Sequence, residues 1–142
     1  MSTPIYELNN LVKRYGDREA FHINRLDIHR GEILGIIGPS GSGKTHLAAA
    51  ISNRLIDEGN AVLFVFVPDL LDHLRSTYSP NSEFSYDEFF DQVRTAPYLV
   101  LDDLGVHNST SWADEKLYQV LNYRYVNKLP TVITLALPLG DL

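Results

Sequence analysis

Hydrophobic residues in this chain gather in short continuous runs, separated by stretches in which they recur at helical spacing. The continuous runs predict strands buried on both faces at residues 33–37, 61–67, 98–101 and 131–135. The periodic stretches predict helices at residues 44–57, 69–78, 85–94 and 112–128, the third capped by Ser85. Because strands alternate with helices, we expect a mostly parallel central sheet between layers of helices.

The first part of the chain follows a different pattern. Residues 5–12 and 20–28 predict two short strands, and Gly16-Asp17 supplies a turn between them. No helix is predicted between these strands, so they are expected to form an antiparallel appendage. The length of 142 residues indicates one domain. We expect residues 1–32 to form the β appendage and residues 33–142 the α/β core.

A glycine-rich segment follows the apolar run at residues 33–37. It matches the phosphate-binding pattern G-x-x-x-x-G-K-[ST] with the residues Gly38, Pro39, Ser40, Gly41, Ser42, Gly43, Lys44 and Thr45. Glycines permit positive φ angles, so that successive backbone N–H groups turn toward phosphate oxygens. A buried strand before the motif and a helix after it predict a three-layer P-loop NTPase fold. A flexible glycine-rich turn is the alternative.

Two side chains of this loop are expected to carry its chemistry. Lys44 is predicted to reach the β- and γ-phosphates and to act in catalysis, and the Thr45 hydroxyl to ligate Mg²⁺. His46 comes next and is counted with the loop among the nucleotide-binding residues. ATP is the expected ligand, and the sequence leaves GTP open as an alternative.

A pair of aspartates closes the apolar run at residues 98–101. Asp102 is expected to meet the metal beside Thr45, which would complete the site. Asp103 is predicted to polarise the attacking water, as the second catalytic residue. A solvated turn after a strand is the alternative for both, and it weighs more for Asp103 because acid–base roles demand tighter geometry.

Tyr15 precedes the strand that leads into the loop, and its ring is a candidate to stack on the nucleotide base. An ordinary half-exposed tyrosine in a hairpin is the alternative. The histidines show no metal-site spacing and are expected to be solvated or packed: His22, His29, His46, His73 and His107.

The stretch at residues 112–128 carries two groups of large side chains. A core-facing stripe is expected from Trp112, Leu117, Val120 and Leu121. A second group resembles an aromatic-basic cluster for nucleic acid, although a packing face is the favoured interpretation: Tyr118, Tyr123, Arg124 and Tyr125.

Composition narrows the functional classes. The chain has no cysteine, which excludes disulfides and thiolate metal sites. The sequence shows no signal-peptide pattern and no apolar run near the ~20 residues of a membrane-spanning helix, so we expect a cytoplasmic protein without a membrane partner. The formal net charge of −6 arises outside residues 1–32, which argues against strong nonspecific nucleic-acid binding by the monomer.

From about residue 5 to residue 45, the chain resembles the opening of an ATP-binding-cassette (ABC) ATPase. The resemblance rests on Leu11-Val12-Lys13-Arg14-Tyr15-Gly16, on residues 30–37 and on the loop that follows. It implies that adenine stacks on the aromatic ring at the position of Tyr15. The Leu-Ser-Gly-Gly-Gln signature of that family is missing, so its mode of dimer catalysis is not expected.

From about residue 43 to residue 142, the chain resembles the AAA+ core of bacterial helicase loaders and transposition helpers. The matching stretches are residues 43–48, 65–71, 99–105, 115–117, 122–125 and 129–134. The resemblance implies that Asp102 and Asp103 form the Walker B element. It also implies an alternative function, as a loader-type ATPase in DNA replication or transposition.

The chain departs from the loader pattern at positions that bear on ATP hydrolysis and on partner binding. That family normally ends its fourth strand in a polar Thr-Asn pair, whereas this chain has Leu135-Ala136 before Leu137-Pro138. The arginine finger, the helical lid and the partner-binding region are expected to be absent, so no helicase partner is expected. We expect a minimal ATP–Mg²⁺-binding domain with weak or no hydrolysis, and a non-catalytic scaffold is a further alternative. The simplest origin is an engineered or designed chimera of the two lineages, with a natural fusion or a fragment as alternatives.

Overall fold

The computed structural model describes residues 4–76, 86–105 and 110–136 of the chain. Several expectations lie outside these residues: the Ser85 cap, His107 and the segment after Ala136.

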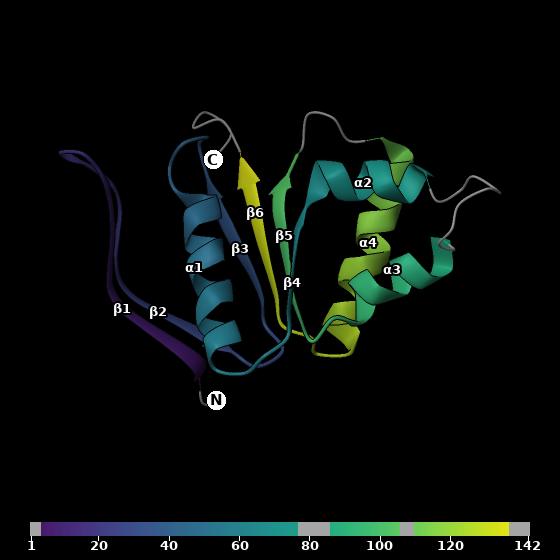
Figure 1. Ribbon diagram of the computed structural model, residues 1–142, viewed down its shortest axis with the longest axis horizontal. Helices are drawn as coiled ribbons and strands as arrows, with labels where there is room; N and C mark the ends of the chain where they lie inside the picture. Colours follow the sequence, from purple (N-terminus) through teal and green to yellow (C-terminus); the bar gives the residue numbers. More distant parts are fainter. Residues whose placement is uncertain (1–3, 77–85, 106–109, 137–142) are drawn as a thin grey trace.

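A parallel four-stranded sheet forms the centre of the fold (Figure 1). Its strands are β3 (Ile33–Gly38), β4 (Val62–Phe66), β5 (Tyr98–Leu104) and β6 (Thr131–Ala136). They lie in the order β3-β6-β5-β4, so the strand before the glycine-rich loop pairs with the last described strand. The expected α/β fold with a parallel sheet is confirmed.

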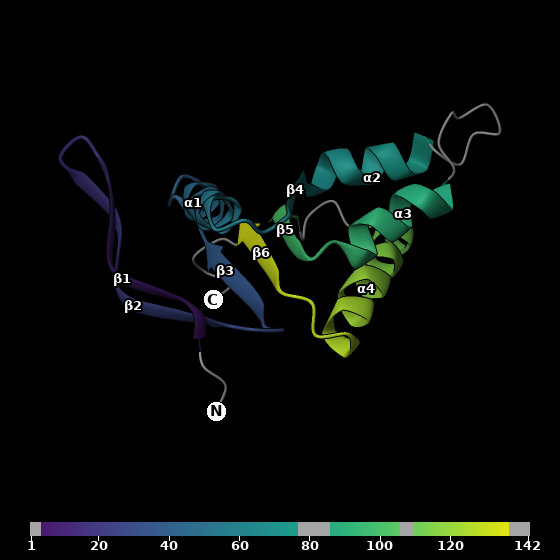
Figure 2. The ribbon, with the colours of Figure 1, turned by 60° about the horizontal axis from the view of Figure 1, so that its bottom comes forward.

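Helices cover both faces of the sheet, as Figure 2 shows. The helices are α1 (Lys44–Asp57), α2 (Val67–Ser76), α3 (Tyr86–Thr95) and α4 (Ser111–Val126). Ala48 of α1 packs with Val100 on one face. Leu99 and Leu101 belong to the other core, with the three later helices. Neighbouring strand residues serve opposite cores because successive side chains point to opposite faces.

An antiparallel hairpin precedes the sheet and lies beside α1 (Figure 1). Its strands, β1 (Pro4–Tyr15) and β2 (Arg18–His29), are longer than the sequence predicts. Gly16 takes a φ of 62° in the turn between them, a conformation that glycine adopts without strain. Ile28 of β2 packs with Leu47 and Ile51 of α1, which attaches the hairpin to the core.

Two strands are less buried than their continuous apolar runs predict. β3 and β4 are the edge strands of the sheet, and Ile37, Phe64 and Phe66 have exposed side chains. The expectation of burial on both faces is wrong for these strands, because an apolar run alone does not distinguish a central strand from an edge strand. β5 and β6 occupy the centre and are largely buried.

Helix boundaries follow the sequence closely. α1 has the predicted bounds, and Gly59 follows it with a φ of 89°. α2 begins at Val67, two residues before the expected start, because Pro68 is tolerated in the first turn of a helix.

None of the described helices is long and apolar enough to cross a membrane.

α4 presents its apolar stripe to the core, as expected, with Val120 fully buried. The expected packing face around the tyrosines is wrong in part: Tyr118 and Tyr125 are 67% and 70% exposed. They lie seven residues apart, which is two helical turns, and so share a face away from the sheet. Arg124 is instead fully buried, so the nucleic-acid interpretation loses its cation.

Candidate nucleotide-binding site

The loop between β3 and α1 has the backbone that a phosphate site requires. Gly41 and Gly43 have φ angles of 80° and 93°, in the left-handed region that favours glycine. The Ser42 hydroxyl and backbone N–H both bond to the Pro39 carbonyl, at 2.7 and 3.3 Å, and close the turn. Because α1 begins at Lys44, its first backbone N–H groups open onto this loop and favour an anion there.

The Lys44 ammonium is held over the same loop. Its Nζ donates to the Pro39 carbonyl at 2.7 Å and to Ser42 Oγ at 3.4 Å. Both acceptors are neutral, so the positive charge is positioned without being neutralised. An incoming phosphate offers this ammonium a stronger, charge-assisted hydrogen bond.

Thr45 and Asp102 meet although they lie 57 residues apart in the sequence. The Thr45 hydroxyl lies 2.9 Å from Asp102 Oδ1 and 3.1 Å from Oδ2. Asp102 is only 4% exposed, at the end of β5 nearest the loop. The structure therefore brings together the two residues that the sequence proposes as metal ligands.

Thr134 on β6 also contacts Asp102, a contact that the sequence does not predict. Its Oγ1 donates to Asp102 Oδ1 at 2.7 Å and accepts from the backbone N–H of Asp103 at 2.8 Å. The contact depends on β6 lying beside β5, which no local motif encodes. The loader pattern concerns the next two positions, where Leu135 and Ala136 stand in place of a polar pair.

Asp103 takes a left-handed backbone conformation, with a φ of 60°. Few residues other than glycine adopt this conformation, and aspartate is among the more tolerant. The side chain is partly buried and lines the hollow above the loop. It is therefore near the predicted phosphate position, as a water-polarising residue must be.

A shallow hollow joins the predicted residues from four parts of the chain. It is lined by Tyr15, Ser40, Gly41, Gly43, Lys44, Thr45, His46, Asp103, Thr134 and Ala136. The remaining loop residues line an adjoining hollow beside Ile23 and Ile37: Gly38, Pro39 and Ser42. Tyr15, 48% exposed, reaches the first hollow from the end of β1.

The donor chemistry of this site fits Mg²⁺. Thr45 and Asp102 offer a hydroxyl and a carboxylate, the oxygen ligands that Mg²⁺ prefers. The described residues contain no cluster of three or more histidines and acidic residues that would form an all-protein metal site. Mg²⁺ is typically held by one or two protein groups together with waters and substrate phosphates, which matches this donor set.

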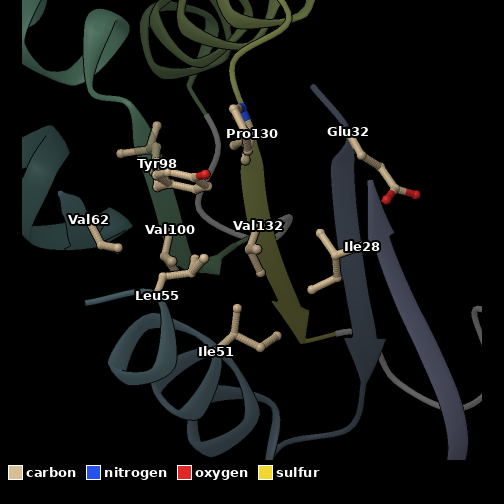
Figure 3. Close-up of a pocket in the computed structure, with 11 residues that line it drawn as sticks. Ile28, Glu32, Ile51, Leu55, Val62, Tyr98, Val100, Pro130 and Val132 are labelled. Atoms are coloured by element: carbon tan, nitrogen blue, oxygen red, sulfur yellow. The ribbon is translucent and has the colours of Figure 1, made fainter. Parts of the chain in front are cut away.

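A second cavity lies at the opposite ends of the strands (Figure 3). Tyr98 opens β5 and Pro130 immediately precedes β6, so this cavity is remote from the loop. Its walls are mainly apolar and include Ile51, Leu55 and Val132. Its lining offers no set of phosphate donors, so this cavity is not a candidate nucleotide site.

This fold and this loop define the class of P-loop NTPase domains. Within that class, the chain belongs to the family of IstB-like ATP binding proteins, whose match covers residues 23–142. The match begins upstream of residue 43, so the loader-like segment is longer than the expected residues 43–142.

Individual relatives agree with this assignment. The replicative helicase loader DnaI of Bacillus subtilis (strain 168) is 35% identical over 103 residues, which are 72% of this chain and 32% of DnaI. A crystal structure of the DnaC helicase loader matches with a TM-score of 0.67 and 32% identity, covering 78% of this chain and 61% of that one. The chain thus spans about a third of the length of DnaI.

The resemblance to ABC ATPases has a structural counterpart. A dimeric ATP-binding cassette solved with ADP and Pi has a TM-score of 0.57 and 16% identity, covering 94% of this chain and 88% of that one. At this identity the likeness concerns the fold alone. A chimeric or engineered origin of the chain stays a prediction.

Proposed function

We propose that this domain binds ATP together with Mg²⁺ and is the nucleotide module of a helicase-loader-type ATPase. The observation that carries the proposal is the hydrogen bond from Thr45 to Asp102, which joins the phosphate-binding loop to the acidic end of β5. Family membership supports ATP as the nucleotide.

Each group has a distinct part in this proposal. The loop N–H groups and Lys44 bind the phosphates, and Thr45 and Asp102 hold Mg²⁺. When bound, Mg²⁺ neutralises charge on the phosphate oxygens. Asp103 lies at the same edge of the sheet and orients the attacking water.

Titration with a fluorescent ATP analogue, with and without Mg²⁺, tests this proposal. We expect saturable binding that is tighter with Mg²⁺, and competition by unlabelled ATP. A parallel titration with GTP measures the base preference. Binding that is undetectable in both conditions would support the alternative of a non-catalytic scaffold.

A role in helicase loading is supported by the relatives. DnaI and DnaC are named as helicase loaders, and they share 35% and 32% identity with this chain over 72% and 78% of its length. Two quantities test this role: the rate of ATP hydrolysis with single-stranded DNA, and the affinity of the domain for single-stranded DNA with ATP. We expect single-stranded DNA to raise the first, or ATP to raise the second. If single-stranded DNA leaves the hydrolysis rate unchanged and does not bind in the presence of ATP, the domain acts as a nucleotide-binding module only.

Tyr15→Ala is expected to weaken ATP binding by about 1–3 kcal/mol, the range measured for base–aromatic stacks. The reason is the place of Tyr15 in the wall of the loop hollow. Binding of inorganic triphosphate, measured by competition, should not change because this ligand has no base. Equal losses for both ligands would show that the ring supports the loop rather than the base.

Hydrolysis is expected to be slow, below the ~1 s⁻¹ at the lower end of the usual enzyme range. Ala136 lines the hollow at the end of β6, and its methyl group cannot hydrogen-bond the γ-phosphate or the attacking water. Ala136→Asn should therefore raise the steady-state rate of phosphate release while leaving the Kd for ATP similar. A wild-type rate above ~1 s⁻¹ that Asp103→Asn abolishes would contradict this expectation.

A further inference from the structure

We propose that Thr134 is a positioning residue, whose hydroxyl fixes Asp102 and Asp103 in the orientation that the nucleotide site uses. The inference rests on the function proposed above. Thr134 is 1% exposed, so water does not readily replace its hydrogen bonds. Thr134 lines the hollow, but its hydroxyl is bonded to both aspartates, so its role is through the aspartates rather than on the nucleotide.

The hydrogen-bond directions at Thr134 are determined by its partners. An ionised Asp102 carboxylate only accepts, so the single hydroxyl proton of Thr134 goes to its Oδ1, 2.7 Å away. The oxygen is then left to accept, and it does so from the Asp103 N–H at 2.8 Å. One hydroxyl thus orients the side chain of one aspartate and the backbone of the next.

An irregularity in the β5–β6 pairing explains why a side chain is needed here. Leu101 pairs with Ile133, but Leu104 pairs with Leu135, so three steps along β5 match two along β6. The extra β5 residue forms a bulge, and a bulge leaves a residue outside the regular ladder and re-aims its side chain. Thr134 supplies an acceptor for the Asp103 N–H at this bulge.

The bulge coincides with the left-handed conformation of Asp103, at a φ of 60°. A conformation of this kind persists only where the surroundings hold it. The bond from Asp103 to Thr134 provides such a restraint from the neighbouring strand, while the second bond fixes Asp102 against Thr45. Removing the hydroxyl should therefore loosen both aspartates and leave the loop itself intact.

The test compares three variants of the full chain. Thr134→Val keeps the shape and removes the hydroxyl, and Thr134→Ser keeps the hydroxyl. Thr131→Val is the matched control, because Thr131 is also 1% exposed on β6 but bonds to Arg124 rather than to the aspartates. Two quantities are measured: the ratio of the ATP Kd without and with Mg²⁺, and the exchange rate of the Asp103 amide hydrogen in nucleotide-free protein by NMR.

In Thr134→Val we expect the Mg²⁺-dependent gain in ATP affinity to fall about tenfold, as for loss of a hydrogen bond to a charged group. Affinity without Mg²⁺ should be unchanged, and Asp103 amide exchange should accelerate. Thr134→Ser should restore both quantities. Thr131→Val should lower the melting temperature and leave both quantities at the wild-type values.

Two results would overturn the inference. One is unchanged Asp103 exchange in Thr134→Val, and the other is an equal loss of ATP affinity with and without Mg²⁺. If the wild-type chain binds no nucleotide, the proposed function fails, and Asp103 exchange still decides whether Thr134 positions this segment. The two failures are thus distinguishable.

Discussion

Lys44→Ala is expected to weaken ATP binding by about a hundredfold or more, measured as the Kd from a fluorescence titration. Lys44 is the cation of the phosphate-binding loop, and its Nζ lies 2.7 Å from the Pro39 carbonyl. A charge-assisted hydrogen bond contributes up to about 3 kcal/mol, and each 1.4 kcal/mol is about tenfold in affinity. The alanine variant loses this contact at the most highly charged part of the ligand.

The Lys44 variant should keep its fold, because the lysine is only partly buried and its partners belong to the exposed loop. Circular dichroism and thermal melting check this expectation. Arg54→Ala removes the same charge from the same helix, where Arg54 forms a surface ion pair with Glu58, and should leave the Kd unchanged. A folded Lys44→Ala protein that binds ATP as tightly as wild type would show that the nucleotide lies elsewhere.

The part of the site that the sequence predicts is the part that lies in short continuous motifs. The loop from Gly38 to Thr45 is continuous in the chain, and its helix has the predicted bounds. Asp102 follows a run of buried residues, and carboxyl ends of parallel strands meet at one edge of a sheet. Two local motifs, together with the rule that parallel strands share one edge, are therefore enough to predict that Thr45 and Asp102 meet.

Contacts between distant strands were not predictable in this way. The bond from Thr134 to Asp102 depends on the strand order and on a one-residue bulge in β5. The exposure of Ile37 and Phe64 depends on the same order, since both belong to edge strands. Strand order is set by the packing of the whole domain, and apolar runs of similar composition do not specify it.

Burial of a charged side chain is the other feature that local patterns miss. Arginine is mostly exposed in proteins, so its place in a helical pattern normally predicts a solvated face. Arg124 is 0% exposed because its acceptors come from segments that converge only in the fold. The guanidinium donates to Thr131 Oγ1 at 2.7 Å and to the carbonyls of Arg94, Ala96 and Pro130 at 3.0, 2.6 and 2.8 Å.

Arg124→Met is expected to lower the free energy of unfolding by about 3 kcal/mol or more, measured by urea denaturation. Burial lowers the pKa of Arg124 to about 10, so the guanidinium remains charged at neutral pH and its burial is costly. Methionine removes that cost, but it leaves the carbonyls of Arg94 and Ala96 without this donor, whereas the Pro130 carbonyl keeps its hydrogen bond from the Leu99 N–H at 3.2 Å. Each unsatisfied buried group costs about 1–3 kcal/mol, and the two carbonyls together outweigh the relief.

Arg124→Lys should recover little of this stability, because one ammonium does not reproduce the planar fork that spans acceptors at the ends of α3 and β6. Arg54→Met is the control at an exposed position of α1 and should change stability by less than about 0.5 kcal/mol. If Arg124→Met unfolds at the wild-type urea concentration, the carbonyls of Arg94 and Ala96 are satisfied without the guanidinium. Arg124 would then fill space between α3, α4 and β6 rather than join them.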